Sequence, residues 1–550
     1  MKDDILKFAL QNAVQFKGKA NEKAVLGKVL SSLKGKKDIK KLSAEVSKIV
    51  AEVNRMKPED QFEKLRETSP ELLEKKKAEK RKLPPLKKAV KGKVITRIPP
   101  EPSKYTHLGH ALSFLINYMY AEEYEGKCLL RFEDTNPGAA KKEYVDAITE
   151  DIEYLGIKPD KILFASDDVP KMHSLAEQLI KEGEAYVCFC DREKMHDLRH
   201  KGLPCDCREK EVAINVEEWR NMLLGKYKEG ECVLRLRGDL EAENQVMRDP
   251  VIFRISYEEH FMHKKKFCVW PLYDFENAVE DGIHKITHIM RSIEFGEMRV
   301  ELQDCIKKLL KLPKQEVIQY GRFKVIGAET QGRVIREMIE KKEISGWDDP
   351  RLVTIKALKR RGIQPETFKE LAVEVGLSTT PTNIDWSVIS AYNRKLLDPK
   401  SNRYFFIPEP KKITVEGAPK REVEIKLHPD KEEKRKISAG SSFYIPAEDM
   451  QAMKEGSLYR LMDCMNIRKK GGKFVFDSLE VEKYRKEGKK ILQWVPADEK
   501  VEVEVLMPDA KLLKGFAEKS AEKIKEGEIV QFVRFGFCRK EKDSFIYTHD

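Results

Sequence analysis

The stretch RIPPEPSKYTHLGHALSFLINY, residues 97–118, decides how this chain folds and where it binds. The short β-branched segment KVITRI leads into it, and apolar residues then recur at helical spacing over 111–119. These two patterns predict a strand that is followed by a helix. His107 and His110 stand on either side of Gly109, where the predicted helix begins.

The histidine pair predicts a binding site for an anion. Residues three positions apart share one side of the first helical turn, and a helix N-terminus offers unpaired N–H groups and partial positive charge. Glycine leaves room there for a flat ring against the backbone. Together these features favour a nucleoside triphosphate whose phosphates face His107 and His110. The alternative is a chance match on the surface, since the pattern is short.

The alternation of strand and helix continues downstream. GKCLLRFEDT (126–135) is a predicted strand, and KEYVDAITEDIEYLGI (142–157) is a predicted helix. This alternation indicates a parallel sheet covered on both faces, the arrangement of the α/β fold class. Such sheets bind their ligands at the carboxyl ends of the strands.

Length and charge indicate several domains and one basic appendage. The chain has 550 residues, too many for a single core, so we expect three to five domains. Residues 1–93 carry 26 Lys and Arg against 13 Asp and Glu, whereas the remainder carries 79 against 80. Residues 1–80 have helical periodicity, so we expect basic helices that bind nucleic acid or another protein, or that form a solvated face.

The sequence predicts a cytoplasmic protein with no membrane partner. No run of ~18 apolar residues is present. The N-terminus, MKDDILKFALQNAVQFKGKA, has no apolar segment of the kind found in signal peptides. Ten cysteines in this length are too sparse for a disulfide framework.

Two close cysteine pairs predict a metal site. The segments VCFC and PCDCR supply four thiols: Cys188, Cys190, Cys205 and Cys207. Four thiolates suit a tetrahedral, structural zinc ion, which would stabilise a charged segment that has little core of its own. His196 and His200 lie between the pairs and are possible substitutes for one thiolate. Four ordinary thiols are the alternative.

Other segments differ in pattern. Residues 83–93 break the helical periodicity and are the candidate linker, while residues 185–270 are irregular. Helical patterns return after about residue 290. From about residue 400 the chain has strands separated by Pro, Gly and Asp, which predicts antiparallel β-barrels.

Three motifs stand in a fixed order along the chain: TRIPPEPSKYTHLGHA, LRFEDTNP and GWDDPRL. Together they resemble the glutamyl/glutaminyl branch of the class I aminoacyl-tRNA synthetases, and HLGH resembles the HIGH signature of that class. The leader KFALQNAVQFKGKANEKAVLGKVL and strands such as RYFFIP and ILQWVP are similar to the archaeal glutamyl members. The resemblance covers nearly the whole chain.

The resemblance implies a multidomain α/β and all-β architecture with five parts. They are a helical basic extension (1–90), the first half of a Rossmann-like catalytic domain (91–190), an acceptor-binding insertion with the cysteine pairs (191–290), the second catalytic half with a helical connector (291–394), and an antiparallel β-barrel anticodon-binding region (395–550). Relatives have a zinc knuckle in the insertion, often with a C-x-H second half where this chain has C-x-C.

The implied reaction has two steps. The α-carboxylate of L-glutamate attacks the α-phosphate of ATP, which carries Mg²⁺, and pyrophosphate leaves. The 2′-OH of the terminal adenosine of tRNA(Glu) then attacks the glutamyl-adenylate, and tRNA(Gln) is a second candidate acceptor. No protein nucleophile is needed, so the protein contributes alignment and charge neutralisation.

The resemblance also implies an amino-acid pocket. Arg97 and Arg291 would bind the two carboxylates, since guanidinium groups form paired hydrogen bonds with them. Glu133 would face the ammonium group, and Tyr273 and Asn277 match other pocket positions. The alternative for each arginine is a structural ion pair.

The ATP end matches the family at His107, Gly109 and His110 but departs from it in a second loop. That loop is usually rich in Lys and Ser, and here it reads ETQGRVIREMI. Arg333 is the candidate cation for the pyrophosphate end, and Gly332 would keep the loop mobile. The alternative is a loop that has lost its catalytic function.

Three other functions remain open. A glutaminyl enzyme shares this architecture, although RFEDT and the leader favour glutamate. A catalytically silent tRNA-binding relative is compatible with the altered loop. A small nucleotidyltransferase that uses HxGH does not explain GWDDPRL or the C-terminal strands.

Overall fold

The structure is a computed structural model that describes residues 2–16, 18–32, 39–69, 72 and 82–550. The chain divides into two compact units, Met1–Lys82 and Leu83–Asp550.

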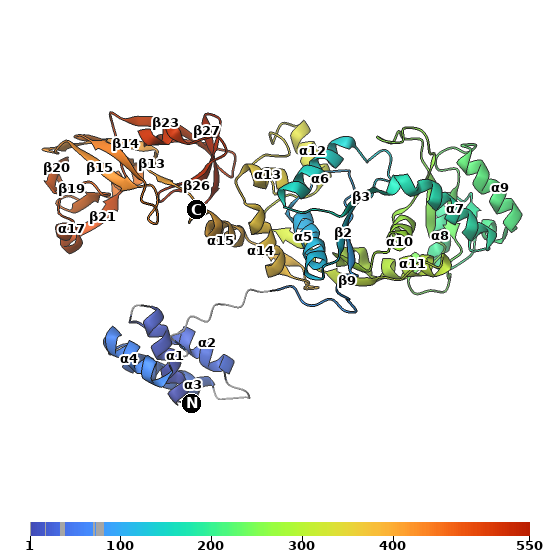
Figure 1. Cartoon of the computed structure of the whole chain (residues 1–550), viewed down its shortest axis with the longest axis horizontal. Helices are drawn as coiled ribbons and strands as arrows, with labels where there is room; N and C mark the ends of the chain where they lie inside the picture. The colour runs from blue at the N-terminus through green and yellow to red at the C-terminus, as the bar shows by residue number, and fades with distance from the viewer. Residues whose placement is uncertain (1, 17, 33–38, 70–71, 73–81) are drawn as a thin grey trace. The chain divides into compact units, whose positions relative to one another are not determined.

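The first unit is helical, as the sequence predicts. Its helices are α1 (Lys2–Gln15), α2 (Glu22–Ser32), α3 (Ile39–Val53) and α4 (Pro58–Thr68) (Figure 1). They enclose an apolar core that includes Ile5, Val46 and Leu65. Buried Gln61 donates a hydrogen bond of 2.8 Å to the Val53 carbonyl and so ties α4 to the end of α3. In the segment TSPELLEKKKAEKRK (68–82), early proline and acidic residues followed by basic ones predict a further helix start, and this segment lies largely outside the described residues.

A parallel sheet organises the second unit. Its strands are β1 (Ile95–Ile98), β2 (Lys127–Phe132), β3 (Lys161–Phe164), β8 (His288–Ser292) and β9 (Glu316–Tyr320). The pairs β1–β2, β2–β3 and β8–β9 are parallel. The Thr287 N–H donates to the Ile95 carbonyl at 2.9 Å, which places β8 beside β1. The predicted parallel α/β sheet is therefore confirmed.

Helices cover both faces of this sheet (Figure 1). The Thr96 hydroxyl donates to the Asn117 carbonyl on α5 (Leu108–Glu123), whereas Arg97 binds Asp281 on α10 (Tyr273–Ile283). Consecutive strand residues point to opposite faces, so α5 and α10 lie on opposite sides. Two predicted helices are thus present as α5 and as α6 (Lys142–Tyr154).

The segment 83–93, predicted as a linker, packs with the second unit. Leu83 and Leu86 are buried in the same apolar core as Leu112 on α5. The Tyr120 hydroxyl donates to the Pro84 carbonyl at 2.7 Å.

The prediction of irregular structure over 185–270 is wrong. A four-stranded antiparallel sheet is formed there by β4 (Ala185–Cys188), β5 (Val233–Leu236), β6 (Val251–Ile255) and β7 (Val269–Pro271). It packs with α7 (Val169–Lys181) and α9 (Val212–Leu223), and Met195 and Leu198 of α8 (Arg192–Lys201) pack against the cluster that contains Tyr186 of β4. Arg235 and Arg254 interrupt the apolar pattern of strands that are already short, so no periodicity was detectable.

The predicted return of helices after residue 290 is confirmed. The elements of this part are α11 (Gly296–Leu309), β10 (Phe323–Val325), α12 (Gly332–Glu340), α13 (Ile355–Arg360), α14 (Pro365–Val375), β11 (Thr382–Ile384) and α15 (Trp386–Leu397).

Two seven-stranded sheets make up most of the C-terminal part. One has the order β12 (Arg403–Tyr404), β25 (Ile529–Phe532), β26 (Gly536–Glu541), β27 (Ser544–His549), β23 (Lys500–Leu506), β24 (Leu512–Glu518), β13 (Phe406–Pro408). The other has the order β21 (Gly488–Leu492), β18 (Leu458–Leu461), β19 (Asn466–Lys470), β20 (Lys473–Ser478), β14 (Pro410–Glu416), β17 (Ser442–Pro446), β22 (Val495–Pro496). A separate pair is formed by β15 (Arg421–Lys426) and β16 (Lys434–Ala439), and two short helices are α16 (Ala447–Ala452) and α17 (Val481–Glu487).

The purely antiparallel prediction is wrong in detail. Most ladders are antiparallel, but β12–β25, β14–β20, β18–β21 and β23–β27 are parallel. Within the described strands no ladder joins the two ends of either sheet, so closure into a barrel remains a prediction.

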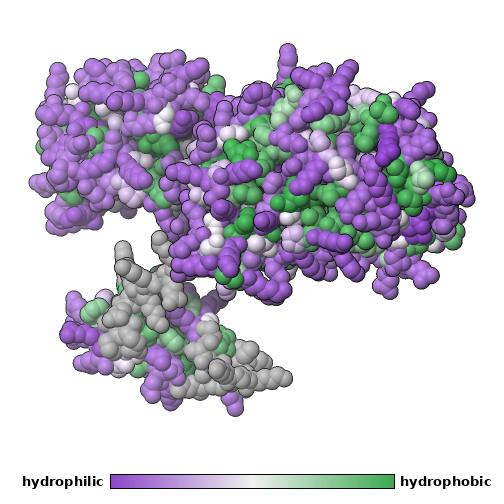
Figure 2. All heavy atoms as spheres, turned by 45° about the vertical axis from the view of Figure 1, so that its right-hand side comes forward, coloured by the Kyte–Doolittle hydropathy of each residue, from purple (hydrophilic) through white to green (hydrophobic). Residues whose placement is uncertain are grey.

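The surface is largely polar. Figure 2 shows mainly hydrophilic side chains on the visible face, with smaller hydrophobic areas between them. In the part of the chain that the structure describes, no helix combines the length and the apolar character that a membrane crossing requires.

Candidate active site

A cavity of about 610 Å³ lies at the carboxyl ends of the parallel strands. Arg97 from β1, Glu133 directly after β2, Arg291 from β8 and Tyr320 at the end of β9 all line it. The ligand site expected at this edge of the sheet therefore has a cavity to occupy.

Most of the site residues that were predicted from the sequence line this cavity. Seven of them line it: Arg97, His107, Gly109, His110, Glu133, Tyr273 and Arg291. Asn277 does not, because its side-chain carbonyl accepts a hydrogen bond from Arg131 at 3.1 Å beneath the pocket. Arg333 also does not line it and lies in the first turn of α12.

The two histidines cap α5. Gly109 N–H donates to His107 Nδ1 at 3.0 Å, and His107 N–H donates to His110 Nδ1 at 3.2 Å. Because Nδ1 accepts in both rings, the proton of each neutral imidazole is assigned to Nε2. The helix start therefore fixes both rings as Nε2–H donors, with centroids 3.9 Å apart.

Removal from water keeps both rings uncharged. It lowers the pKa of His107 to about 3, with nearby Lys104 and Arg322 acting in the same direction. The pKa of His110 is also lowered well below its ordinary value, first by desolvation and then by His107. The rings thus contribute hydrogen-bond donors rather than charge. Lys104 and Arg322 also line the cavity and are the cations near the histidines that sequence reasoning missed.

Glycine at position 109 is required by close packing. A Cβ there would lie 3.0 Å from Cε1 of His107 and 3.3 Å from the Phe323 carbonyl oxygen. A Cβ at this position would therefore fit only if the His107 ring or the Phe323 backbone moved by a few tenths of an ångström.

A buried ion network supports the other end of the cavity. Asp281 Oδ1 accepts hydrogen bonds from Arg97 Nε at 3.0 Å and from Arg131 Nη1 at 2.7 Å. Burial alone would raise the pKa of Asp281, but the two guanidinium groups outweigh it and lower that pKa. Arg131 and Asp281 were not predicted, because only the fold brings β1, β2 and α10 together.

The arginines of the cavity retain unused donors. Arg97 Nη1, Arg291 Nε and Arg291 Nη2 are buried and have no hydrogen-bond partner among the described residues. Arg291 Nη1 donates to Gln303 at 3.0 Å, and burial lowers the pKa of Arg291. Buried donors without partners are costly, so this end of the cavity is arranged to receive acceptor groups.

An acidic wall completes the pocket. Glu133 accepts a hydrogen bond from Arg131 Nη2 at 3.0 Å, and Glu276 accepts one from the Thr135 hydroxyl. Burial raises the pKa of both carboxyl groups. Tyr273 stacks on Phe295 with ring centroids 5.4 Å apart. Glu276 lines the cavity but was not predicted, since nothing in YDFENAVED distinguishes it from a surface acid.

The GWDDPRL motif adjoins the histidine segment. Leu108 N–H donates to the Val353 carbonyl at 2.9 Å, and His107 forms an isolated antiparallel bridge with Thr354. Trp347 stacks on Tyr105 with centroids 4.8 Å apart. Two motifs that are far apart in sequence therefore hold the start of α5 together.

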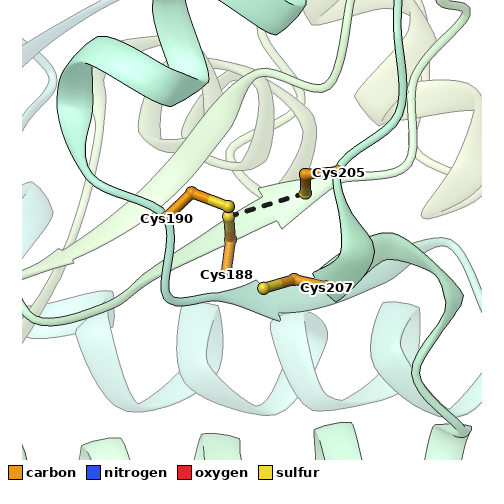
Figure 3. Close-up of side chains that lie close together, drawn as sticks. All are labelled: Cys188, Cys190, Cys205 and Cys207. Atoms are coloured by element: carbon orange, nitrogen blue, oxygen red, sulfur yellow. Dashed lines mark hydrogen bonds between the residues drawn. The ribbon is translucent and has the colours of Figure 1, made fainter.

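The four predicted zinc ligands lie together away from the cavity (Figure 3). Their sulfur atoms are within 4.8 Å of one another, and Sγ of Cys188 and Cys205 are 3.8 Å apart. Zinc–sulfur bonds of about 2.3 Å in a tetrahedron separate neighbouring sulfurs by about 3.8 Å. Arg235 Nη1 lies 3.7 Å from the Sγ atoms of Cys188 and Cys205. A hydrogen bond with Cys188 lowers the pKa of the Cys205 thiol. The donor set and spacing fit a structural zinc ion. His196 and His200 are not part of this cluster.

Known families match nearly the whole of the second unit. Residues 93–399 match "tRNA synthetases class I (E and Q), catalytic domain". Residues 401–483 and 491–541 match two anti-codon binding domains of the same group.

Curated relatives extend the similarity to the N-terminus. The chain is 42% identical to the glutamate--tRNA ligase of Pyrococcus abyssi (strain GE5 / Orsay) over 99% of both chains. It is 42% identical to that of Pyrococcus furiosus over 98% of this chain and 96% of the relative, and 39% identical to that of Korarchaeum cryptofilum over the full length of both. A solved glutamate tRNA ligase from Elizabethkingia meningosepticum aligns with 56% of this chain and 70% of that chain at 19% identity and a TM-score of 0.41, too low to add an argument. The chain belongs to the class I tRNA synthetases of the glutamyl and glutaminyl group.

Proposed function

We propose that this synthetase attaches L-glutamate to the terminal adenosine of tRNA(Glu) by way of a glutamyl-adenylate. The observation that supports glutamate is the pair of guanidinium groups with unused donors, Arg97 and Arg291, in one cavity. A dicarboxylate supplies the acceptors that these donors lack. Similarity to glutamate--tRNA ligases along the whole chain supports the same substrate.

In this proposal each end of the cavity binds one anion. Arg97 and Arg291 hold the two carboxylates of glutamate, Glu133 accepts from its ammonium group, and Tyr273 forms the pocket wall. Asn277 acts indirectly, through its hydrogen bond with Arg131.

ATP then lies at the other end of the cavity, against Gly109. The Nε2–H groups of His107 and His110 donate to the phosphates, and Lys104 and Arg322 supply charge. Mg²⁺ on the triphosphate neutralises charge when it is bound. The α-carboxylate attacks the α-phosphate in this alignment, and pyrophosphate carries away the displaced electron pair.

Arg333 is proposed as a further cation on the pyrophosphate. It follows Gly332 at the start of α12, and a Cβ at Gly332 would lie 3.2 Å from the Cβ of Lys104. Since Lys104 lines the cavity, a small movement of the 329–333 loop would bring Arg333 to the phosphates.

We also propose that the remaining parts of the chain bind the tRNA, and that the protein acts in the cytoplasm. Residues 191–290, with zinc on the four cysteines, would contact the acceptor end, and residues 395–550, as a barrel region, would bind the anticodon. The basic helices of residues 1–90 would bind nucleic acid or another protein, because net positive charge attracts polyanions. The catalytic domain is accordingly proposed to span 91–190 and 291–394, connector included.

Charging assays with both amino acids and both tRNAs test the proposal. We expect glutamate to be attached to tRNA(Glu), and pyrophosphate exchange to require glutamate, ATP and tRNA together. Charging with glutamine would instead support the glutaminyl alternative. Binding of tRNA with no pyrophosphate exchange would support the silent relative and overturn the proposed activity.

A further inference from the structure

A second group of metal-binding side chains lies outside the cavity, at the end of α10. Glu280 and His284 are four residues apart along this helix and its C-cap, so they share one side. Asp168, which caps the start of α7, meets them there. One ligand atom from each residue lies within 4.8 Å of those of the other two.

The separations match those between ligands of a metal ion. His284 Nε2 is 3.3 Å from Asp168 Oδ2 and 3.3 Å from Glu280 Oε2. N–H···O hydrogen bonds are usually shorter, at about 2.9–3.0 Å. Zinc–ligand bonds of about 2.0–2.1 Å in a tetrahedron place neighbouring donors about 3.3–3.4 Å apart.

Glu280 is a buried carboxylate in ion-pair contact with His284. Its exposed fraction is 0%, and neither carboxylate oxygen has a hydrogen-bond partner within the described part of the chain. Burial raises its pKa, although His284 and Arg131 oppose this. Arg131 binds Asp281, Glu133 and Asn277 through Nη1 and Nη2, and its Nε has no hydrogen-bond partner among the described residues, so Arg131 donates no hydrogen bond to Glu280. A buried carboxylate in this position calls for a cation.

We propose that Asp168, Glu280 and His284 bind a zinc ion, in addition to the ion at the four cysteines. Imidazole with carboxylates suits zinc, whereas Mg²⁺ and Ca²⁺ prefer sites made of oxygen alone. The side chains of Asp168 and His284 are 30% and 17% exposed, so solvent supplies the fourth ligand. The ion ties α10 to α7 and balances two carboxylates beside the network that supports Arg97.

Metal content of the full chain tests the proposal without any substrate, so its outcome is independent of the proposed aminoacylation. Protein is loaded with zinc, desalted and analysed for zinc per chain. We expect His284→Gln to retain one zinc ion per chain fewer than the unaltered chain. This difference does not depend on how much zinc the cysteine cluster retains, because both chains contain that cluster. His263→Gln is the matched control, because His263 Nε2 lies 3.3 Å from a single carboxylate, that of Asp167. It should lose no zinc.

Equal zinc in the unaltered chain and in His284→Gln would overturn the proposal. If that variant does not fold, an anomalous difference map at the zinc edge, from crystals of the unaltered chain grown with zinc, decides the matter. A peak between Asp168, Glu280 and His284 supports the site. A map with a peak at the cysteines and none at α10 refutes it.

Discussion

The cavity has a histidine end, formed by His107 and His110, and an arginine end, formed by Arg97 and Arg291 and supported by Arg131. The two ends differ in the groups that hold their side chains in place and in the charge that these side chains carry. His107 and His110 are fixed by backbone N–H groups at the start of α5 and are uncharged. Arg97 and Arg131 are fixed by the carboxylate of Asp281 and keep their charge although both are buried.

In the proposed assignment, one cavity binds two anions by different physical means. In this assignment ATP brings Mg²⁺, and Lys104 and Arg322 add charge, so the two histidines need to supply only neutral donors with a fixed direction. A free amino acid brings none, so its carboxylates need protein charges that are already in place. Holding such charges in a buried site requires an opposite charge, and Asp281 supplies it to Arg97 and Arg131.

Removing the negative charge of Asp281 should have the largest effect on the free energy of unfolding. Asp281→Asn takes the carboxylate away from buried Arg97 and leaves buried Arg131 with Glu133 alone, and breaking a buried pair in this way costs about 3–5 kcal/mol. We expect a loss of stability of this size in urea denaturation of the full chain, together with loss of glutamate binding.

Asp146→Asn is the control for Asp281→Asn. It also removes one carboxylate from an ion pair, with Lys142 at 2.6 Å, but its side chain is 55% exposed. Exposed pairs contribute little, so the change should stay within about 0.5 kcal/mol. Equal losses in both variants would show that the buried network does not support the fold.

The unused donors of Arg291 give the second prediction. Arg291→Ala should raise the KM for glutamate about 100-fold and leave the KM for ATP nearly unchanged, since removing a charged hydrogen-bond donor costs about 1.5–3 kcal/mol. Arg291→Lys should fall between, because an ammonium group cannot form the paired contact. Equal changes in both KM values would contradict the division of the cavity into two ends.

The third prediction concerns the Nε2–H group that His110 is proposed to donate to the phosphates. The amide of glutamine reaches the position of Nε2, whereas that of asparagine reaches only Nδ1. We expect pyrophosphate exchange to fall about 10-fold in His110→Gln and about 100-fold in His110→Asn. If asparagine were the better replacement, the capping contact rather than the Nε2–H donor would be the important one.

The lowered pKa of His107 predicts how stability depends on pH. With a folded pKa of about 3 against about 6.5 when unfolded, the ring stabilises the fold fully above pH 6.5. Between pH 6.5 and pH 3 only the unfolded chain takes up the proton, so stability is lost as pH falls. At pH 5 the loss should be on the order of 1–2 kcal/mol.

His107→Asn isolates this effect, because asparagine caps a helix well and has no such proton to gain. Denaturation at pH 7.5 and pH 5 should show a smaller pH dependence in the variant than in the unaltered chain. An identical pH dependence would mean that the pKa of His107 is the same in the folded and the unfolded chain.

Local sequence patterns were enough for the central sheet and for much of the cavity. β1, α5, β2 and α6 follow one another as strand, helix, strand and helix, and the residues of the HLGH, TRIPP and RFEDT motifs lie near the strand and helix ends, so the fold brings them together. Contacts between distant segments were not predictable. Asp281 meets Arg131 across 150 residues, and the apolar pattern of β5 and β6 is broken by Arg235 and Arg254. Asn277 was placed in the pocket, yet the turn of α10 directs it to Arg131.

The smallest expected effect is at Arg333, outside both ends of the cavity. Because it does not line the cavity, it can act only when the 329–333 loop moves, and Lys104 and Arg322 already supply charge near the histidines. Arg333→Ala should therefore slow pyrophosphate exchange about 10-fold or less, which corresponds to about 1.4 kcal/mol, and should leave the KM for glutamate unchanged. The matched control is Arg336→Ala, three residues further along α12, where Arg336 Nη1 donates to the Ser103 carbonyl at 3.2 Å. Equal rates in the Arg333 variant and the unaltered enzyme would leave phosphate binding to Lys104, Arg322 and the two histidines.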